Sequence, residues 1–279
     1  PEGLMPPKGK HYIDVKELLR CFTNPLKLYF REHLNVKFWK EKESKEEEEF
    51  VLSYPNIAEL RRDSLKNSNK VLVENALKKG KFPLHAFKEV AHIKIADEIE
   101  ALHNALKAAK LGGRDLKKYH LEPFLNLELA ATTHVVLTGE LEGVTQEGLF
   151  IFERCQMAKA ARHLPSFLIL NHIRRANLIF GKDGKTHLPF FEDPSPLLKT
   201  CLEYYFVCHS APSFLFPDWI EPILQQDVKK LAKVMAQKSF AEELKFASRN
   251  QMVPGPEQII QIWGNWAERL YGGMKQGWF

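Results

Sequence analysis

Amphipathic spacing dominates the first part of the chain. Apolar residues recur at i, i+3, i+4 and i+7 after Asp14, a favoured N-cap residue, so a helix is expected to begin there. Asn24, followed by a proline, predicts a second helix start, because asparagine caps a helix and proline fits its first position. The stretches 57–77 and 84–110 have the same spacing. The pattern predicts that residues 1–118 form a helical part of the domain.

After residue 118 the hydrophobic pattern changes to the two-residue period of β-strands. Apolar and β-branched residues alternate or cluster in the segments 125–129, 134–138, 139–144 and 149–152. Since only short turns separate these segments, they predict a β-meander in which each strand pairs with the next.

The remaining pattern is mostly helical and contains one hairpin. Segments 177–180 and 186–190 predict this hairpin. Helices are expected at 166–176, 196–209, 219–238 and from Pro256 onward. Residues 119–279 should therefore form a sheet with flanking helices, and the order of elements predicts an α/β (α+β) fold. We expect the chain to be one compact domain of a longer protein.

Composition narrows the class of protein. The chain has 279 residues, of which 44% are hydrophobic and 27% charged, as in ordinary globular proteins. No apolar run approaches the ~18 residues of a transmembrane helix, so no membrane partner is expected. Four cysteines without a CxxC pair are too few for a disulfide scaffold. They predict buried, reduced thiols in a cytoplasmic protein.

Positive charge is concentrated in the predicted helical part. The net charge is +5, and residues 51–118 hold 14 Lys and Arg against 8 Asp and Glu. Residues 119–160, in contrast, hold 2 basic and 6 acidic residues. The net charge alone is weak evidence for nucleic-acid binding, but the distribution places a basic helical region before an acidic strand region.

The sequence lacks several common catalytic motifs. There is no GxxxxGK[ST] phosphate loop, and neither GxSxG nor HExxH occurs. These absences exclude a P-loop ATP site and two frequent classes of hydrolase.

One arrangement invites comparison with metal-dependent nucleases. Such enzymes need oxygen ligands on adjacent strands and a lysine near the scissile phosphate. Their sequence form is an acid on one strand, a tight turn, and Asp/Glu-x-Lys on the next. Glu142 occupies the first acid position, but Phe152 occupies the second and Arg154 the lysine position. A phenyl ring cannot ligate a metal, so the carboxylate pair is broken.

A shifted register does not restore this pattern. Glu153 would then be the second acid, but Cys155 would stand where the lysine belongs. Strand alternation also turns Glu153 to the face opposite Phe152. The favoured interpretation is that Glu142 is a solvent-facing strand residue. An unusual metal site built from Glu89, Glu142 and Glu153 remains an alternative.

A family resemblance rests on several segments. Residues 12–36 combine a hydrophobic helix with a proline and an aromatic–leucine–valine series. This stretch resembles the start of the C-terminal domain of RecC, the exodeoxyribonuclease V gamma subunit. Shorter resemblances occur, in the same order, at 82–89, 137–139, 146–149 and 210–217.

The resemblance implies a RecB-nuclease-like (PD-(D/E)xK restriction-endonuclease-like) core, in which helices flank a mixed sheet and the active site is degenerate. Glu89 stands where the active nuclease has a histidine, and Glu142 stands for its first aspartate. Phe152 and Arg154 replace the ends of its Asp-x-Lys motif. The resemblance thus implies neither a catalytic residue nor a metal site.

The resemblance also implies a function. It is that of the non-catalytic C-terminal domain of RecC in the RecBCD helicase–nuclease, acting in double-strand-break repair by homologous recombination. Its roles would be subunit docking and the guidance or splitting of DNA strands. Expected partners are RecB-like and RecD-like subunits, double-stranded DNA ends and unwound single strands. No cofactor is expected in this domain, whereas ATP and Mg²⁺ are expected at the partner subunits.

Two other functions stay open at this point, namely an active Mg²⁺-dependent nuclease and a pure protein-interaction scaffold. A DNA-guiding role would need basic side chains on phosphates and aromatic rings on unpaired bases. The DNA-binding candidates are Arg61, Arg62, Lys66, Lys78, Lys79, Lys81, Arg174 and Arg175. Candidates for a docking surface are Trp263, Trp266 and Trp278, although Trp263 is expected to pack in the core.

Overall fold

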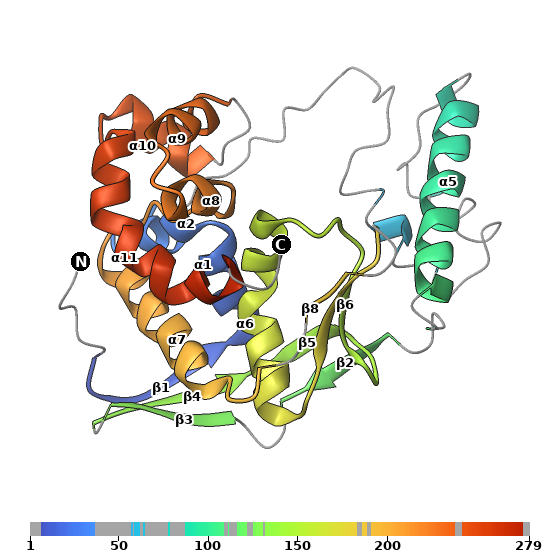
Figure 1. Cartoon of the computed structure of the whole chain (residues 1–279), viewed down its shortest axis with the longest axis horizontal. Coiled ribbons are helices and arrows are strands. Elements are labelled where there is room, and N and C mark those ends of the chain that lie inside the picture. Colours follow the sequence, from blue (N-terminus) through green and yellow to red (C-terminus); the bar gives the residue numbers. More distant parts are fainter. Residues whose placement is uncertain are drawn as a thin grey trace.

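Two mixed β-sheets and the helices around them form the computed structural model of this chain (Figure 1). The structure describes residues 7–36, 57, 59–61, 64, 78, 87–108, 111, 116–121, 125–130, 132–182, 186–188, 191–237 and 242–275. Within these residues the expected α+β composition is confirmed. Most of the helix expected at 57–77 lies outside the described residues.

The smaller sheet joins the N-terminus to the middle of the chain. Its order is β1–β4–β3, with β1 (Gly9–Asp14) parallel to β4 (Thr133–Thr138). Strand β3 (Leu125–Ala130) pairs with β4 in the antiparallel sense. Strand β1 was not expected, because its partner lies about 120 residues away and leaves no local signal. The predicted boundary at residue 118 stays a prediction, but this sheet contains strands from both sides of it.

The larger sheet has the order β2–β5–β6–β7–β8. Its bounds are β2 (Lys117–His120), β5 (Glu140–Val144), β6 (Gly148–Ile151), β7 (Asn177–Phe180) and β8 (Thr186–Leu188). Strands β6 and β7 are parallel, and the other neighbours are antiparallel. The predicted hairpin between β7 and β8 is confirmed.

The predicted continuous meander is wrong at one point. Strands β4 and β5 follow each other directly, yet they belong to different sheets. Gly139 between them has a φ of 104°, a conformation that favours glycine. A Cβ there would lie 2.9 Å from a carboxylate oxygen of Asp14. The chain therefore bends at Gly139 and leaves the smaller sheet instead of turning back along it.

The two N-terminal helices begin where their caps predicted. Asp14 accepts a hydrogen bond from the backbone N–H of Lys16 (2.7 Å) at the start of α1 (Val15–Thr23). Asn24 accepts one from the N–H of Lys27 (3.2 Å) at the start of α2 (Pro25–Glu32). The long helix expected at 84–110 is α5 (Phe87–Ala108).

The C-terminal helices differ from the expectation in three places, one of which is α10 (Glu242–Arg249), a helix that the pattern did not predict. Helix α6 (Met157–Ile173) begins before the predicted start at residue 166 and contains Pro165. The single helix expected at 219–238 is α8 (Pro217–Leu224) and α9 (Val228–Met235). The other helices are α7 (Ser195–Ser210) and α11 (Pro256–Lys275).

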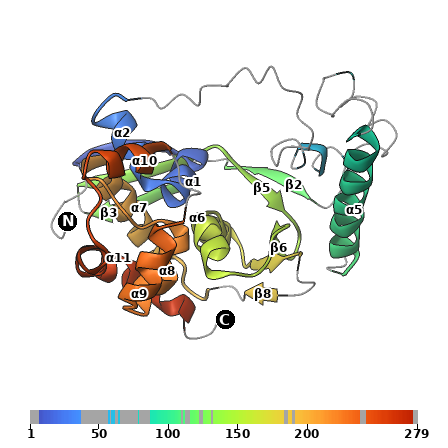
Figure 2. The same ribbon diagram turned by 90° about the horizontal axis from the view of Figure 1, so that it is seen from above.

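Helix α6 and helix α5 cover opposite faces of the larger sheet. Leu149 and Ile151 of β6 join the main core, which contains the buried side of α6. Phe150, from the same strand, packs with Leu102 and Leu106 of α5 in a second cluster. Figure 2 shows α6 beside the sheet, and in both views α5 lies at the opposite end of the molecule from α9 and α10.

The main core also contains cysteines and tryptophans that the sequence analysis considered. Cys21, Cys201 and Cys208 are free and buried, as expected. Trp263 is 2% exposed and lies in the core, as expected, whereas Trp266, at 5%, is also a core residue and not part of the docking surface suggested for it. Trp278 lies outside the described residues. No helix within the described ranges has the length and apolar character needed to cross a membrane.

Candidate functional site

The hairpin of β5 and β6 carries the positions that a nuclease would use. Its turn is held by Thr145, whose hydroxyl contacts both the N–H (3.1 Å) and the carbonyl oxygen (3.0 Å) of Gly148. The guanidinium of Arg174 donates to the carbonyl oxygens of Gln146 (2.8 Å) and Thr145. A side chain at Gly148 would collide with the backbone of Asn177, so only glycine fits. The hairpin is therefore fixed against β7.

Glu142 is exposed on β5 and faces a lysine of the neighbouring strand. One carboxylate oxygen of Glu142 lies 3.5 Å from Nζ of Lys118 on β2. The same ammonium lies 3.0 Å from Glu140, and His120 lies 3.2 Å from the other oxygen of Glu140. The hydrogen bond from Lys118 lowers the pKa of Glu140. The two carboxylates thus share the ammonium of Lys118.

Phe152 lies just after β6 and is half-buried, and two cations lie near its ring. The guanidinium carbon of Arg61 is 5.1 Å from the ring centroid, and Nζ of Lys182 is 5.5 Å from it. Both distances lie within the range of a cation–π interaction. Glu98 of α5 lies 3.3 Å from Arg61 and 3.9 Å from Lys182. We call these four residues, Arg61, Glu98, Phe152 and Lys182, the ring cluster.

The ring cluster connects α5 to the end of β6. Phe152 packs against the apolar cluster that contains Leu102, Ala105 and Leu106 of α5. Arg61 is 9% exposed, so its charge is largely removed from water. Both cations share the carboxylate of Glu98, and two positive side chains at one place repel a further cation. A divalent cation is disfavoured at such a place.

Glu153 faces the other side of the sheet. Its carboxylate lies 3.0 Å from Nζ of Lys159 on α6. His163 on the same helix has its pKa lowered to about 4, mainly by burial, against the opposing effect of Glu153. His163 is therefore neutral at pH 7. Phe152 and Glu153 point to opposite layers, as strand alternation predicts.

The structure does not bring the three candidate acids together. Glu89 is exposed in the first turn of α5. Glu98, the residue of α5 in the ring cluster, is nine residues further on, which is about 14 Å along the helix. Glu142 faces β2, and Glu153 faces α6. Among the described residues, no group of three His, Cys, Asp or Glu side chains could hold a metal ion. The residues of the hairpin therefore do not fit a divalent metal.

The described DNA-binding candidates have different environments. Arg61 belongs to the ring cluster, and Arg174 holds the β5–β6 turn. Lys78 and Arg175 are exposed, and so is Arg154, which stands at the nuclease lysine position. Candidates outside the described residues are Arg62, Lys66, Lys79 and Lys81. Sequence reasoning did not find Glu98 or Lys182, because no motif links them to Phe152.

A comparison with protein families agrees with the resemblance in the sequence. The family model described as the RecC C-terminal domain matches residues 10–227. This stretch covers most of the chain, from β1 to the loop before α9. The chain therefore belongs to the RecC C-terminal domain family.

Membership in this family indicates a role as part of a subunit of RecBCD, the exodeoxyribonuclease V complex, in DNA repair. None of the curated proteins matched the chain.

Proposed function

We propose that this chain is the non-catalytic C-terminal domain of a RecC subunit, which docks partner subunits and guides or splits DNA strands during double-strand-break repair. Its core would be a RecB-nuclease-like fold that has lost its metal site. RecB-like and RecD-like subunits would be its partners, and they would supply the sites for ATP and Mg²⁺. Its location would be the cytoplasm.

The observation that carries this proposal is the ring cluster. A metal-dependent nuclease needs an oxygen ligand at the position of Phe152. Here the position holds a ring that has Arg61 and Lys182 beside it. The cations occupy the region in which a metal ion would have to bind, and they form packing and ion-pair contacts instead. The replacement supports a structural role for this end of the sheet.

The remaining acids support the same proposal. Glu142 and Glu153 each face a lysine, and the two lysines belong to different elements, β2 and α6. Moving either acid toward a shared metal would break its ion pair. Lys118 and Lys159 do not belong to the ring cluster around Phe152. This arrangement fits surface ion pairs better than a catalytic centre.

A cleavage assay tests the proposal. The full 279-residue chain would be incubated with linear duplex DNA and either Mg²⁺ or Mn²⁺, beside the Glu142→Gln and Glu89→Gln variants. We expect no cleavage above background in any of them. Turnover that is lost in Glu142→Gln and kept in Glu89→Gln would identify an active nuclease and overturn the proposal.

The strand-guiding part requires contact with phosphates. Of the described candidates, Lys78 and Arg175 have exposed side chains. We expect the chain to bind a forked duplex with an affinity that falls steeply with salt, because bound phosphates release counterions. Lys78→Glu and Arg175→Glu should weaken this binding about threefold or more each, whereas Glu257→Gln, which changes an exposed residue of α11, should not weaken it.

A scaffold without DNA contact is the second candidate function. It is favoured by one observation, which is that Arg61 and Arg174 are used inside the domain and not presented to a ligand. In that case fork binding would be undetectable at physiological salt, or unchanged by both charge reversals. Assembly with the RecB-like and RecD-like subunits would remain intact.

A further inference from the structure

A pocket of about 550 Å³ opens between α8, α9 and α10. Its volume lies within the usual range of ligand pockets, roughly 300–1,000 Å³. The lining residues are Trp219, Met235, Leu244, Lys245, Ser248, Arg249 and Val253. Six of the seven follow residue 227, beyond the stretch that the family model matches. The hairpin and the ring cluster contribute none of them.

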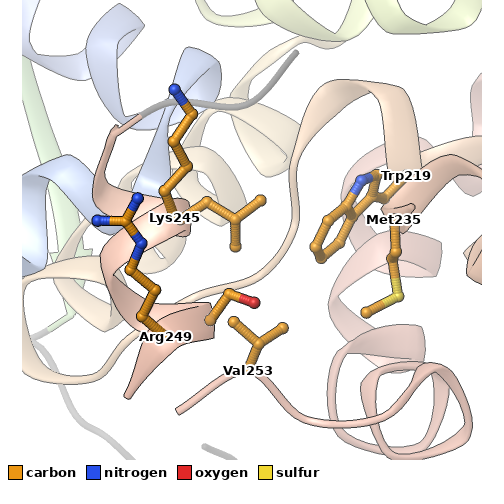
Figure 3. A pocket seen from close by; sticks show the side chains of 7 residues that line it. Trp219, Met235, Lys245, Arg249 and Val253 are labelled. Carbon is orange, nitrogen blue, oxygen red and sulfur yellow. The ribbon is translucent and has the colours of Figure 1, made fainter. Parts of the chain in front are cut away.

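The pocket has an apolar interior and a basic side. Figure 3 shows Trp219 and Met235 on one side of the space, with Lys245 and Arg249 on the other. Leu244 and Val253 add further apolar surface. Methionine adapts its shape to different apolar partners, which suits a surface that binds another protein.

The two cations differ in their partners. Nζ of Lys245 lies 2.7 Å from the carboxylate of Glu242, one turn earlier on α10. Arg249 is exposed, and no acidic side chain of the described chain pairs with it. Its guanidinium can therefore donate two parallel hydrogen bonds to a carboxylate or a phosphate, the bidentate geometry that arginine favours.

The surrounding segment is basic. Residues 228–253 contain six Lys and Arg (Lys229, Lys230, Lys233, Lys238, Lys245 and Arg249) but only two acids, Glu242 and Glu243. Glu243 is 5% exposed and accepts a hydrogen bond from Asn24 (3.0 Å), so it points away from solvent. Residues 217–227 add the acids Asp218, Glu221 and Asp227, and Lys230 pairs with Glu221 (2.7 Å). The lining itself holds two cations, Lys245 and Arg249, and no acid, and this favours an anionic occupant.

The burial of Trp219 distinguishes between two possible anionic occupants, an unpaired nucleotide and an acidic peptide. An unpaired nucleotide would need an aromatic face on which its base could stack. Trp219 is the aromatic residue of the lining, and it is only 1% exposed, packed 4.9 Å from Phe216 between ring centroids. It offers no free face. An apolar side chain, in contrast, needs only a non-polar cavity, and an adjacent acid could pair with Arg249.

We propose that this pocket binds an acidic segment of a partner protein, which inserts apolar side chains between α8, α9 and α10 and places a carboxylate on Arg249. Phe246 and Met252, the sequence neighbours of the lining residues Lys245 and Val253, are 40% and 38% exposed. This inference rests on the docking role proposed above and assigns it to a defined surface.

A displayed library of random 12-residue peptides tests this assignment. The full chain would be used for selection, and the Ser248→Trp variant, which fills the pocket, for counter-selection. We expect the enriched peptides to be net negative and to carry at least two large apolar residues. Enrichment of basic peptides, or no enrichment over counter-selection, would contradict the proposal.

The selected peptide would then be labelled and measured by fluorescence polarisation. Arg249→Glu should weaken its binding about fivefold or more, because the contact changes from attraction to repulsion. Arg249→Lys should weaken it less, and Lys107→Glu, on the distant α5, should leave it within about twofold. Equal affinity for the wild-type and Arg249→Glu chains would show that Arg249 is not part of the site.

Two further measurements separate this inference from the broader proposal. If Ser248→Trp and Arg249→Glu remove binding of a 20-residue oligothymidylate but not of the peptide, the occupant is a nucleic acid and the assignment is wrong. Co-purification of the wild-type chain with RecB-like and RecD-like subunits tests docking itself. Failure of that assembly would overturn the docking role, whatever the peptide assay shows.

Discussion

At the scale of single residues, Phe152 stands where the proposal requires a lost metal ligand, and its ring makes packing contacts there instead. A carboxylate at this position would belong to a metal site, whereas the ring lies near Arg61 and Lys182 and against the apolar side of α5. Glu98 balances part of the positive charge. The same position thus joins two layers of the domain.

Removing the ring should therefore cost stability. We expect Phe152→Ala to lower the free energy of unfolding by about 2 kcal/mol, since a half-buried ring and two cation–π contacts are lost. Urea denaturation measures this change. Val90→Ala, at a residue of α5 that is 64% exposed, should change it by less than about 0.5 kcal/mol. Equal effects of the two substitutions would contradict the role of the ring cluster.

His163 gives the domain a pH dependence with a defined sign. Its pKa is about 4 in the folded chain because of burial, and about 6.5 for an exposed histidine. Between these values the unfolded chain binds more protons, so the free energy of unfolding falls as the pH decreases from about 6.5 to about 4.

The His163→Gln substitution should reduce this dependence. The free energy of unfolding should then fall less between about pH 6.5 and about pH 4. The loss over this window should be smaller than in the wild-type chain by up to about 3 kcal/mol. His103→Gln, at an exposed position of α5, should leave this loss unchanged. Parallel curves for the wild-type and His163→Gln chains would show that His163 is not protonated on unfolding.

At the scale of elements, the break between α8 and α9 shows a conformation that the sequence pattern did not indicate. Gln226 has a φ of 53°, in the left-handed region where a side chain is strained. Its N–H donates to the carbonyl oxygen of Ile223 (3.1 Å), which closes the end of α8. The apolar spacing continues across this residue, so a single helix was predicted.

Glycine should relieve the strain at this break. Gln226→Gly is expected to raise the free energy of unfolding by about 0.5–1 kcal/mol, because glycine adopts positive φ at no steric cost. The neighbouring Gln225 has a φ of −81°, so Gln225→Gly should instead destabilise the chain slightly. Thermal or urea unfolding would compare the two variants. A loss of stability in both would contradict the strain at Gln226.

Local signals in the sequence predicted most single elements but not their assembly. The caps at Asp14 and Asn24 placed two helices correctly, because capping depends on neighbouring residues. The parallel pairing of β1 with β4 could not be found in this way, since it depends on segments far apart in the chain. The bend at Gly139 was missed for a similar reason.

The candidate site, too, could be predicted only in part from the sequence. The motif comparison identified Phe152 as an unusual residue, because its expected counterpart is an acid at a known spacing. The other three members of the ring cluster come from three other segments of the chain. They are Arg61, Glu98 and Lys182. Their meeting is a property of the tertiary structure, so no local pattern could predict it.

At the scale of the whole molecule, the features discussed here lie in separate places. The ring cluster and the hairpin belong to the larger sheet and α5, whereas the pocket belongs to the C-terminal helices at the other end (Figure 2). This separation allows the proposed loss of metal chemistry and the proposed binding of an acidic segment to be tested independently. The family model matches the hairpin, whereas most of the pocket lies beyond the matched stretch.

The most direct test of the central claim is Mn²⁺ binding to the purified chain, followed by electron paramagnetic resonance of the free ion. A chain whose hairpin has lost its metal ligands should leave the free Mn²⁺ signal the same as in the Glu142→Gln variant, at up to millimolar metal. Stoichiometric loss of that signal in the wild-type chain, restored by Glu142→Gln, would show instead that the hairpin still holds a metal ion.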